Sequence, residues 1–237
     1  MFKIKKAKNG KSFLVKMKEA VETLTKNEIP RQLTIAGCFR KFSDMIVGCY
    51  LPIFFMTKYP TFKTTYAALG AVSLAILGFC SNMIGGFVGD GLEKKNPLIK
   101  SQLLAGSALM SCPLLALCCL APGGFWMSFL AMSAHVLVSG GYSSLAITMM
   151  QNSVDSDDLG SAISSYNLFT NMAQTVSPIL FGFLATFLNL KKTGSYGLPI
   201  TIFIIAGYLP SAIYYFASGR SYKRDVVDKD EGDPVFA

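Results

Sequence analysis

Residues 65–87 read TYAALGAVSLAILGFCSNMIGGF, an uninterrupted run without a single charged side chain. A helix needs about 20 largely apolar residues to cross the roughly 30 Å hydrocarbon core of a bilayer. The run is much longer than the roughly 10 residues of a strand in a membrane barrel, and it lacks the strict alternation of such strands. This stretch therefore predicts a transmembrane helix.

Other segments have the same length and character, so the sequence predicts an all-α membrane protein with six transmembrane helices. The predicted spans are residues 33–56, 65–87, 101–121, 125–150, 161–188 and 198–216.

The composition of the whole chain supports this class. Of its 237 residues, 51% are hydrophobic and only 15% are charged, whereas soluble domains contain about 25% charged residues. A soluble enzyme and a disordered chain are thereby excluded. The six cysteines lie inside the apolar runs without the spacing of metal ligands, so we expect no metal site. The net charge of +8 comes from residues that flank the apolar runs, and we expect no nucleic-acid partner.

Positively charged residues set the predicted orientation, because Lys and Arg are retained on the cytoplasmic side of a membrane. They concentrate in the two tails and in the loop between the second and third spans. The loops on the opposite side hold only Lys58, Lys63, Lys191 and Lys192. We therefore expect a multi-pass membrane protein with both termini in the cytoplasm.

The sequence divides into three parts. Residues 1–32 form a cytoplasmic segment in which Leu14, Met17, Val21 and Leu24 recur at helical spacing. Such an amphipathic helix either lies on the inner membrane surface or packs on other cytoplasmic elements. Residues 33–218 form the six-helix bundle, and residues 219–237 form a charged cytoplasmic tail.

Three charged residues, Arg40, Lys41 and Asp44, lie within the first span. A charge at this depth costs at least about 2.5 kcal/mol, so such residues normally face the interior of a bundle or a water-filled cavity. The i, i+4 spacing of Arg40 and Asp44 places them on one helical face, close enough to pair. They are candidates for a substrate or proton pathway, and the alternative is a structural ion pair.

His135, the single histidine of the chain, lies in the middle of the fourth span. Ser139 and Tyr142 follow it at helical spacing on the same face. Because histidine changes charge near neutral pH, we expect these three residues to line a substrate or proton pathway. The alternative is a neutral histidine bonded to a neighbouring helix.

The fifth span carries a polar stripe that includes Asn167, Asn171 and Gln174 and ends at Pro178. Amide side chains cannot face lipid without a hydrogen-bonding partner. The stripe therefore either lines a cavity or bonds to other helices. Residues 101–121 and 198–216, in contrast, are apolar enough to face lipid. In each half of the chain, the first two spans carry residues suited to line a cavity and the third is apolar enough to lie on the outside. This order, repeated twice, is typical of two inverted three-helix repeats in a transporter.

The loop between the second and third spans reads GFVGDGLEKK at residues 86–95. Gly86, Asp90, Lys94 and Lys95 resemble the signature loop of the major facilitator superfamily, from which Gly91 and Glu93 depart. The polar stripe resembles the eleventh helix of that family, and residues 36–40 (AGCFR) resemble its spinster-like members. As a whole the chain is similar to the C-terminal six-helix half of such a transporter.

This resemblance implies transport of a small organic solute, lipid-like or sugar-like, by alternating access between two six-helix bundles. The residues named above would then line the pathway, and the loop residues Gly86, Asp90, Lys94 and Lys95 would form a latch against residues 160–164. One bundle supplies only one wall of the cavity. We therefore expect a partner in the bilayer: a missing N-terminal half, a second copy or another membrane subunit.

Two functions remain open at this point. The first is half of a secondary transporter, and the alternative is a non-transporting truncated or split subunit that binds a partner protein. An enzyme is not expected, because the sequence shows no catalytic triad and no phosphate-binding loop, and we expect no cofactor.

Overall fold

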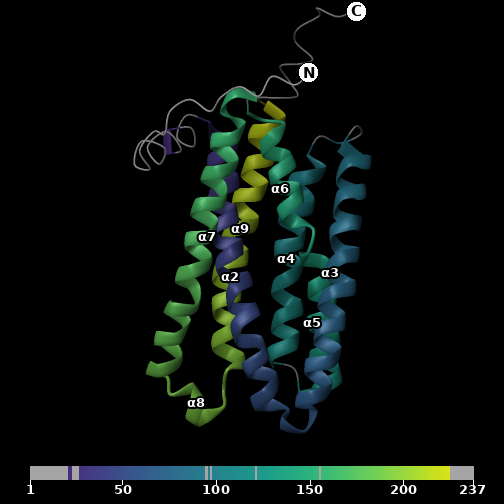
Figure 1. Cartoon of the computed structure of the whole chain (residues 1–237), viewed down its shortest axis with the longest axis vertical. Coiled ribbons are helices and arrows are strands. Elements are labelled where there is room, and N and C mark those ends of the chain that lie inside the picture. Colours follow the sequence, from purple (N-terminus) through teal and green to yellow (C-terminus); the bar gives the residue numbers. More distant parts are fainter. Residues whose placement is uncertain are drawn as a thin grey trace, which may run out of the picture.

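The computed structural model describes residues 21–22, 27–93, 96, 98–120, 122–154 and 156–224, and it shows a bundle of long helices (Figure 1). Its elements in chain order are α2 (Glu28–Lys58), η1 (Pro60–Phe62), α3 (Lys63–Glu93), α4 (Ile99–Leu120), α5 (Gly124–Ser139), α6 (Tyr142–Gln151), α7 (Ser156–Phe187), α8 (Leu190–Thr193) and α9 (Gly197–Tyr222).

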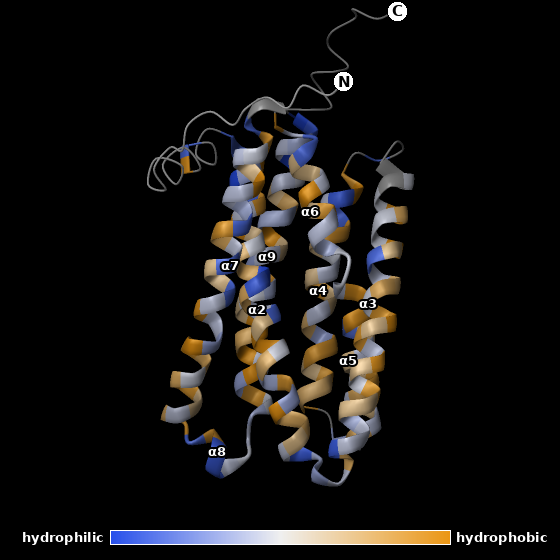
Figure 2. Cartoon of the chain, in the orientation of Figure 1, coloured by the Kyte–Doolittle hydropathy of each residue, from blue (hydrophilic) through white to orange (hydrophobic). Residues whose placement is uncertain are grey.

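Within this part of the chain, five helical stretches are long and apolar enough to cross a membrane. They comprise α4, α9, most of α3 and α7, and α5 together with α6. Helix α2 is not among them and carries Arg40, Lys41 and Asp44 in its middle. Figure 2 shows apolar residues, in orange, along the long helices, mixed with hydrophilic residues towards the top of α7. The chain is thus an integral, multi-pass membrane protein, and α2 as a sixth span stays a prediction.

The first and last long helices meet at one end of the bundle. Arg224 Nη2 lies 2.9 Å from Glu28 Oε2, and the Ser221 hydroxyl donates to the same carboxylate at 3.3 Å. The first and last long helices therefore begin and end at the same end of the bundle. Most of the predicted amphipathic segment and of the C-terminal tail lies outside the described residues, so their predicted roles are not tested.

Helix α9 forms the centre of the bundle together with α4 and α2, against which it packs most extensively. Its residues Tyr208 and Tyr215 are fully buried, as are Leu104 and Leu115 of α4. The prediction that these two spans lie on the outside is therefore wrong for one face of each helix. An apolar helix suits a protein core as well as lipid, and composition cannot distinguish the two.

The fourth predicted span, residues 125–150, lies within one stretch that is long and apolar enough to cross a membrane, and a turn at Gly140 and Gly141 divides this stretch into α5 and α6. A Cβ atom on Gly141 would lie 2.8 Å from the Ser81 carbonyl oxygen and 3.2 Å from the Gly85 Cα atom of α3. The Gly141 N–H donates to the Ser81 hydroxyl at 3.2 Å. The glycines of both helices thus permit a close approach between α3 and the junction of α5 and α6.

The three-helix repeats do not pack as separate units. Helix α2 contacts mainly α7 and α9, and α4 contacts mainly α9 and α5, so helices of the first and second halves interleave. The arrangement as two inverted repeats stays a prediction.

Gly207 of α9 decides how closely α9 approaches α2. A Cβ atom at this position would collide with the Ser43 side chain and would lie 2.9 Å from the Phe39 carbonyl oxygen. We expect Gly207→Ala to lower the free energy of unfolding by about 1–3 kcal/mol, because overpacking displaces α9 from α2. Denaturant unfolding in detergent micelles measures the change.

Gly106→Ala is the matched control, since a Cβ on Gly106 meets nothing within 4 Å. Equal stability of the two variants would contradict the assigned helix contact.

Candidate functional site

A cavity of about 390 Å³ opens between α2, α3, α5 and the start of α6. Four of the predicted pathway residues line it, and they come from three different helices: Asp44, His135, Ser139 and Tyr142. The structure therefore brings together residues that lie almost one hundred positions apart in the sequence. Lys41 lines the same cavity and adds a positive charge to it.

Arg40 lies behind this cavity and is completely buried. Its Nη1 donates to the Ser107 hydroxyl of α4 at 3.2 Å, and its Nε lies 3.8 Å from Asp44 Oδ1. The guanidinium carbon lies 4.4 Å from the centre of the Tyr142 ring and 4.9 Å from that of Tyr208. The ion pair predicted from the i, i+4 spacing is thus formed. Stacking on two aromatic rings further stabilises the buried cation.

Asp44 connects the buried arginine to the cavity. Its Oδ1 accepts a hydrogen bond of 2.6 Å from the Tyr208 hydroxyl, and its side chain remains 26% exposed. The carboxylate is therefore stabilised by two groups on the protein side while it can still reach water or a solute on the other side. Removing Asp44 would leave Arg40 without its only negatively charged neighbour among the described residues.

His135 lies in the cavity wall with only 4% of its surface exposed. Its Nε2 lies 3.5 Å from the Ser139 hydroxyl, and its ring centre lies 6.1 Å from that of Tyr208. Its Nδ1 is buried and has no hydrogen-bond partner. A buried ring nitrogen without a partner is costly unless a water molecule, an ion or a solute supplies one.

The polar stripe of α7 lies elsewhere. Asn167 and Asn171 are exposed, and the half-buried Gln174 amide lies 3.4 Å from Met45 Sδ of α2. None of the three lines the cavity that contains Asp44 and His135. Within this chain the structure therefore does not join the stripe to the other predicted pathway residues.

Two residues of the predicted latch, Gly86 and Asp90, lie within α3, which continues to Glu93. Helix α3 packs on α5, α6 and α4, while α7 packs mainly on α2, and the two helices stand at opposite edges of the bundle (Figure 1). Among the described residues α3 and α7 thus share no extensive packing, and the latch between Asp90 and residues 160–164 stays a prediction. The Asp90 side chain, Lys94 and Lys95 lie outside what the structure describes.

Sequence reasoning missed Tyr208, which contacts Arg40, Asp44 and His135 at once. A signal for it was present: Tyr208, Ser211 and Tyr215 recur at helical spacing in an otherwise apolar helix, and all three are completely buried. The described residues contain no group of three or more His, Cys, Asp or Glu side chains that could hold a metal ion.

An apolar helical bundle with charged residues around a cavity defines a polytopic membrane protein. The family model of the Major Facilitator Superfamily matches residues 33–235, and the chain belongs to that family. This membership points to a transporter rather than an enzyme, and it confirms the predicted family. A comparison with curated protein sequences finds no match.

Among solved structures, the chain is similar to a bacterial homologue of the human lysosomal transporter Spinster, captured in an inward-facing and unoccupied conformation. The TM-score is 0.69 and the sequence identity is 16%, over 93% of this chain and 54% of that one. At this identity the likeness establishes the fold. The chain spans about half the length of the solved transporter.

Proposed function

We propose that this chain forms one of the two bundles of a secondary transporter, and that the cavity around Asp44 and His135 is one wall of its solute pathway. The observation that carries the proposal is the cavity itself. It holds a carboxylate, an ammonium group and an imidazole inside a membrane-spanning fold. Ionisable groups at this depth are costly, and they normally serve a substrate or ion pathway.

The lining of the cavity favours a solute with a polar head and an apolar body. Lys41, Asp44 and His135 supply ionic and hydrogen-bonding groups, while Leu51, Leu74 and Met132 supply an apolar wall. A sugar offers hydroxyl groups on all sides and would leave this wall poorly matched. We therefore favour a lipid-like solute over a sugar.

Alternating access requires a second bundle opposite this cavity. The chain spans 54% of the similar transporter structure, which is consistent with one bundle of two. A missing N-terminal half, a second copy or a separate membrane subunit would supply the opposite wall.

Uptake into proteoliposomes tests the proposal. The chain is reconstituted at increasing protein density with an imposed pH gradient, and the solutes are a labelled lysophospholipid, a labelled sphingoid base and a labelled hexose. We expect saturable uptake of a single-chain lipid. If two copies must associate, the uptake rate should rise with the square of the protein density. Hexose uptake alone would overturn the preferred substrate class. No uptake, with or without a co-purified partner, would favour the non-transporting subunit.

The polar stripe of α7 provides a separate prediction. We expect Asn171→Cys, in a background without the native cysteines, to react with a membrane-impermeant thiol reagent, because the stripe faces water rather than lipid in the assembled transporter. The matched control is Ile179→Cys, which lies on the same helix and is also exposed. Equal labelling of both positions, or of neither, would show that the stripe does not face an aqueous pathway.

A further inference from the structure

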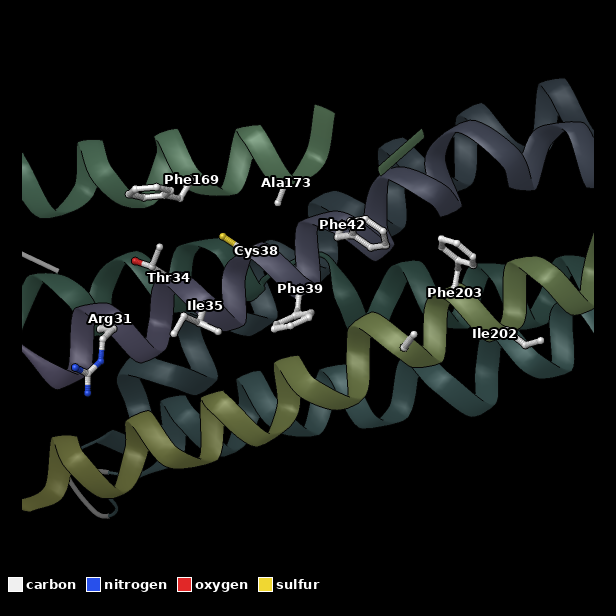
Figure 3. Close-up of a pocket in the computed structure, with 11 residues that line it drawn as sticks. Arg31, Thr34, Ile35, Cys38, Phe39, Phe42, Phe169, Ala173, Ile202 and Phe203 are labelled. Carbon is white, nitrogen blue, oxygen red and sulfur yellow. The ribbon is translucent and has the colours of Figure 1, made fainter. Parts of the chain in front are cut away.

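A second and larger space, a groove of about 660 Å³, runs between α2, α7 and α9 (Figure 3). Its walls are almost entirely apolar and include Ile35, Phe39, Phe169 and Ile202. Arg31 lies at one end of it, and the stacked rings of Phe42 and Phe203 lie towards the other, with their centres 6.2 Å apart. The groove forms because α7 and α9 both pack on α2 but make few contacts with each other.

The groove faces away from the proposed solute pathway. On α2, Phe42 in the groove and Asp44 in the polar cavity are two positions apart, which is about 200° around a helix. On α7, Phe169 in the groove and Asn171 in the polar stripe are related in the same way. A second bundle that faces the polar cavity would leave the groove open to the bilayer. Its occupant is then expected to come from the lipid.

The length of the groove along α2 matches the thickness of one bilayer leaflet, and its charged end matches the position of the lipid headgroup. Arg31 and Phe42 are eleven positions apart on α2, about 16 Å along the axis at 1.5 Å per residue. Half of the hydrocarbon core of a bilayer is about 15 Å thick. The Arg31 side chain is exposed, and within the described part of the chain no ion pair or side-chain hydrogen bond engages its guanidinium. It therefore lies where a lipid phosphate would be, with the apolar walls where the acyl chain would be.

We propose that the groove binds an anionic phospholipid of the leaflet on the Arg31 side, with its headgroup on Arg31 and one acyl chain between α7 and α9. This lipid is a bound component of the fold and not the transported solute. It supplies α7 with an additional packing partner, because α7 otherwise packs mainly on α2. The placement of the groove towards the bilayer rests on the two-bundle arrangement proposed above, but it does not depend on which solute is transported.

Photo-crosslinking tests the site. The full chain is reconstituted in vesicles that contain a trace of phosphatidylglycerol or phosphatidylcholine, each with the same diazirine-bearing acyl chain, and the labelled peptides are mapped by mass spectrometry. We expect labelling of peptides that contain the groove residues, with about a fivefold preference for phosphatidylglycerol. Such a preference corresponds to about 1 kcal/mol, as expected for one basic residue near an anionic headgroup.

Two variants test the headgroup contact and the acyl-chain contact separately. Arg31→Gln should retain groove labelling but lose the preference for phosphatidylglycerol, whereas Arg220→Gln, which removes an exposed arginine at the same end of the bundle, should retain the preference. Ala206→Trp fills the groove and should reduce labelling by both lipids at least fivefold. Its control is Ile213→Trp, at an exposed position of the same helix outside the groove.

Groove labelling that is equal for both lipids, or a preference that survives Arg31→Gln, would overturn the assigned headgroup contact. Labelling that maps elsewhere would overturn the site. A photoreactive amino acid placed at Ile202 adds an independent measurement. Crosslinks from it to phospholipid support the proposal, and crosslinks to a second copy or to another protein contradict it.

Discussion

Replacing His135 with alanine should reduce proton-driven uptake at least tenfold while leaving downhill exchange of the solute measurable. His135 is the single histidine of the chain, and histidine is the side chain that ordinarily changes charge near neutral pH. It lies in the same cavity wall as Asp44 and Lys41, and the Tyr208 ring packs nearby. Its Nδ1 has no partner in the protein, so a proton can be gained or lost there without breaking an internal hydrogen bond.

The measurement is uptake of the single-chain lipid in proteoliposomes with and without an imposed pH gradient. His135→Gln serves as a second variant, since glutamine can still bond to the Ser139 hydroxyl but cannot exchange a proton. We expect it to lose gradient-driven uptake as the alanine variant does. Unchanged gradient-driven uptake in both variants would show that His135 is a packing residue.

Replacing Asp44 with alanine should damage the fold as well as transport. Arg40 is completely buried, and Asp44 is the carboxylate that lies beside it. Breaking a buried ion pair by removing one partner costs about 3–5 kcal/mol. Because Asp44 is 26% exposed, we expect a loss of about 3 kcal/mol, at the lower end of that range. The loss is measured by denaturant unfolding of the purified chain in detergent micelles.

A double variant distinguishes this cause from simple loss of packing. In Arg40→Met/Asp44→Ala the uncompensated charge is gone, and an apolar side chain fills a similar volume, so stability should recover much of the loss. Asp44→Asn is the conservative control, because its amide oxygen can still accept the hydrogen bond from Tyr208. If the double variant is no more stable than Asp44→Ala, the ion pair does not carry the effect.

Much of the fold follows from local sequence. Long apolar runs predict most of the membrane helices, because span length and side-chain transfer energy belong to each segment separately. The Arg40–Asp44 pair follows from helical spacing alone, since residues i and i+4 are neighbours in any helix. The family resemblance carried by residues 86–95 and by the α7 stripe agrees with the family match.

Prediction from local sequence was incomplete where a residue suits more than one environment. Residues 198–216 are apolar enough for lipid, yet one face of α9 forms the centre of the bundle with Tyr208 and Gly207. The run over 125–150 does form one stretch long enough to cross a membrane, but its sequence did not indicate the turn at Gly140 and Gly141, where it contacts Ser81 and Gly85 of α3. Both features depend on contact with a helix that is distant in the sequence.

By itself, then, the sequence determined that this is a helical membrane protein of the major facilitator type, and which residues carry charge within its spans. Only the tertiary structure decided which of these residues meet. It placed Ser107, Tyr142 and Tyr208 of three other helices around Arg40, and it left Asn171 outside the cavity that holds Asp44 and His135. The reason is that helix formation depends on residues within a few positions of one another. Which faces of two helices pack together depends instead on small residues that permit close contact and on side chains that fill the space between the helices.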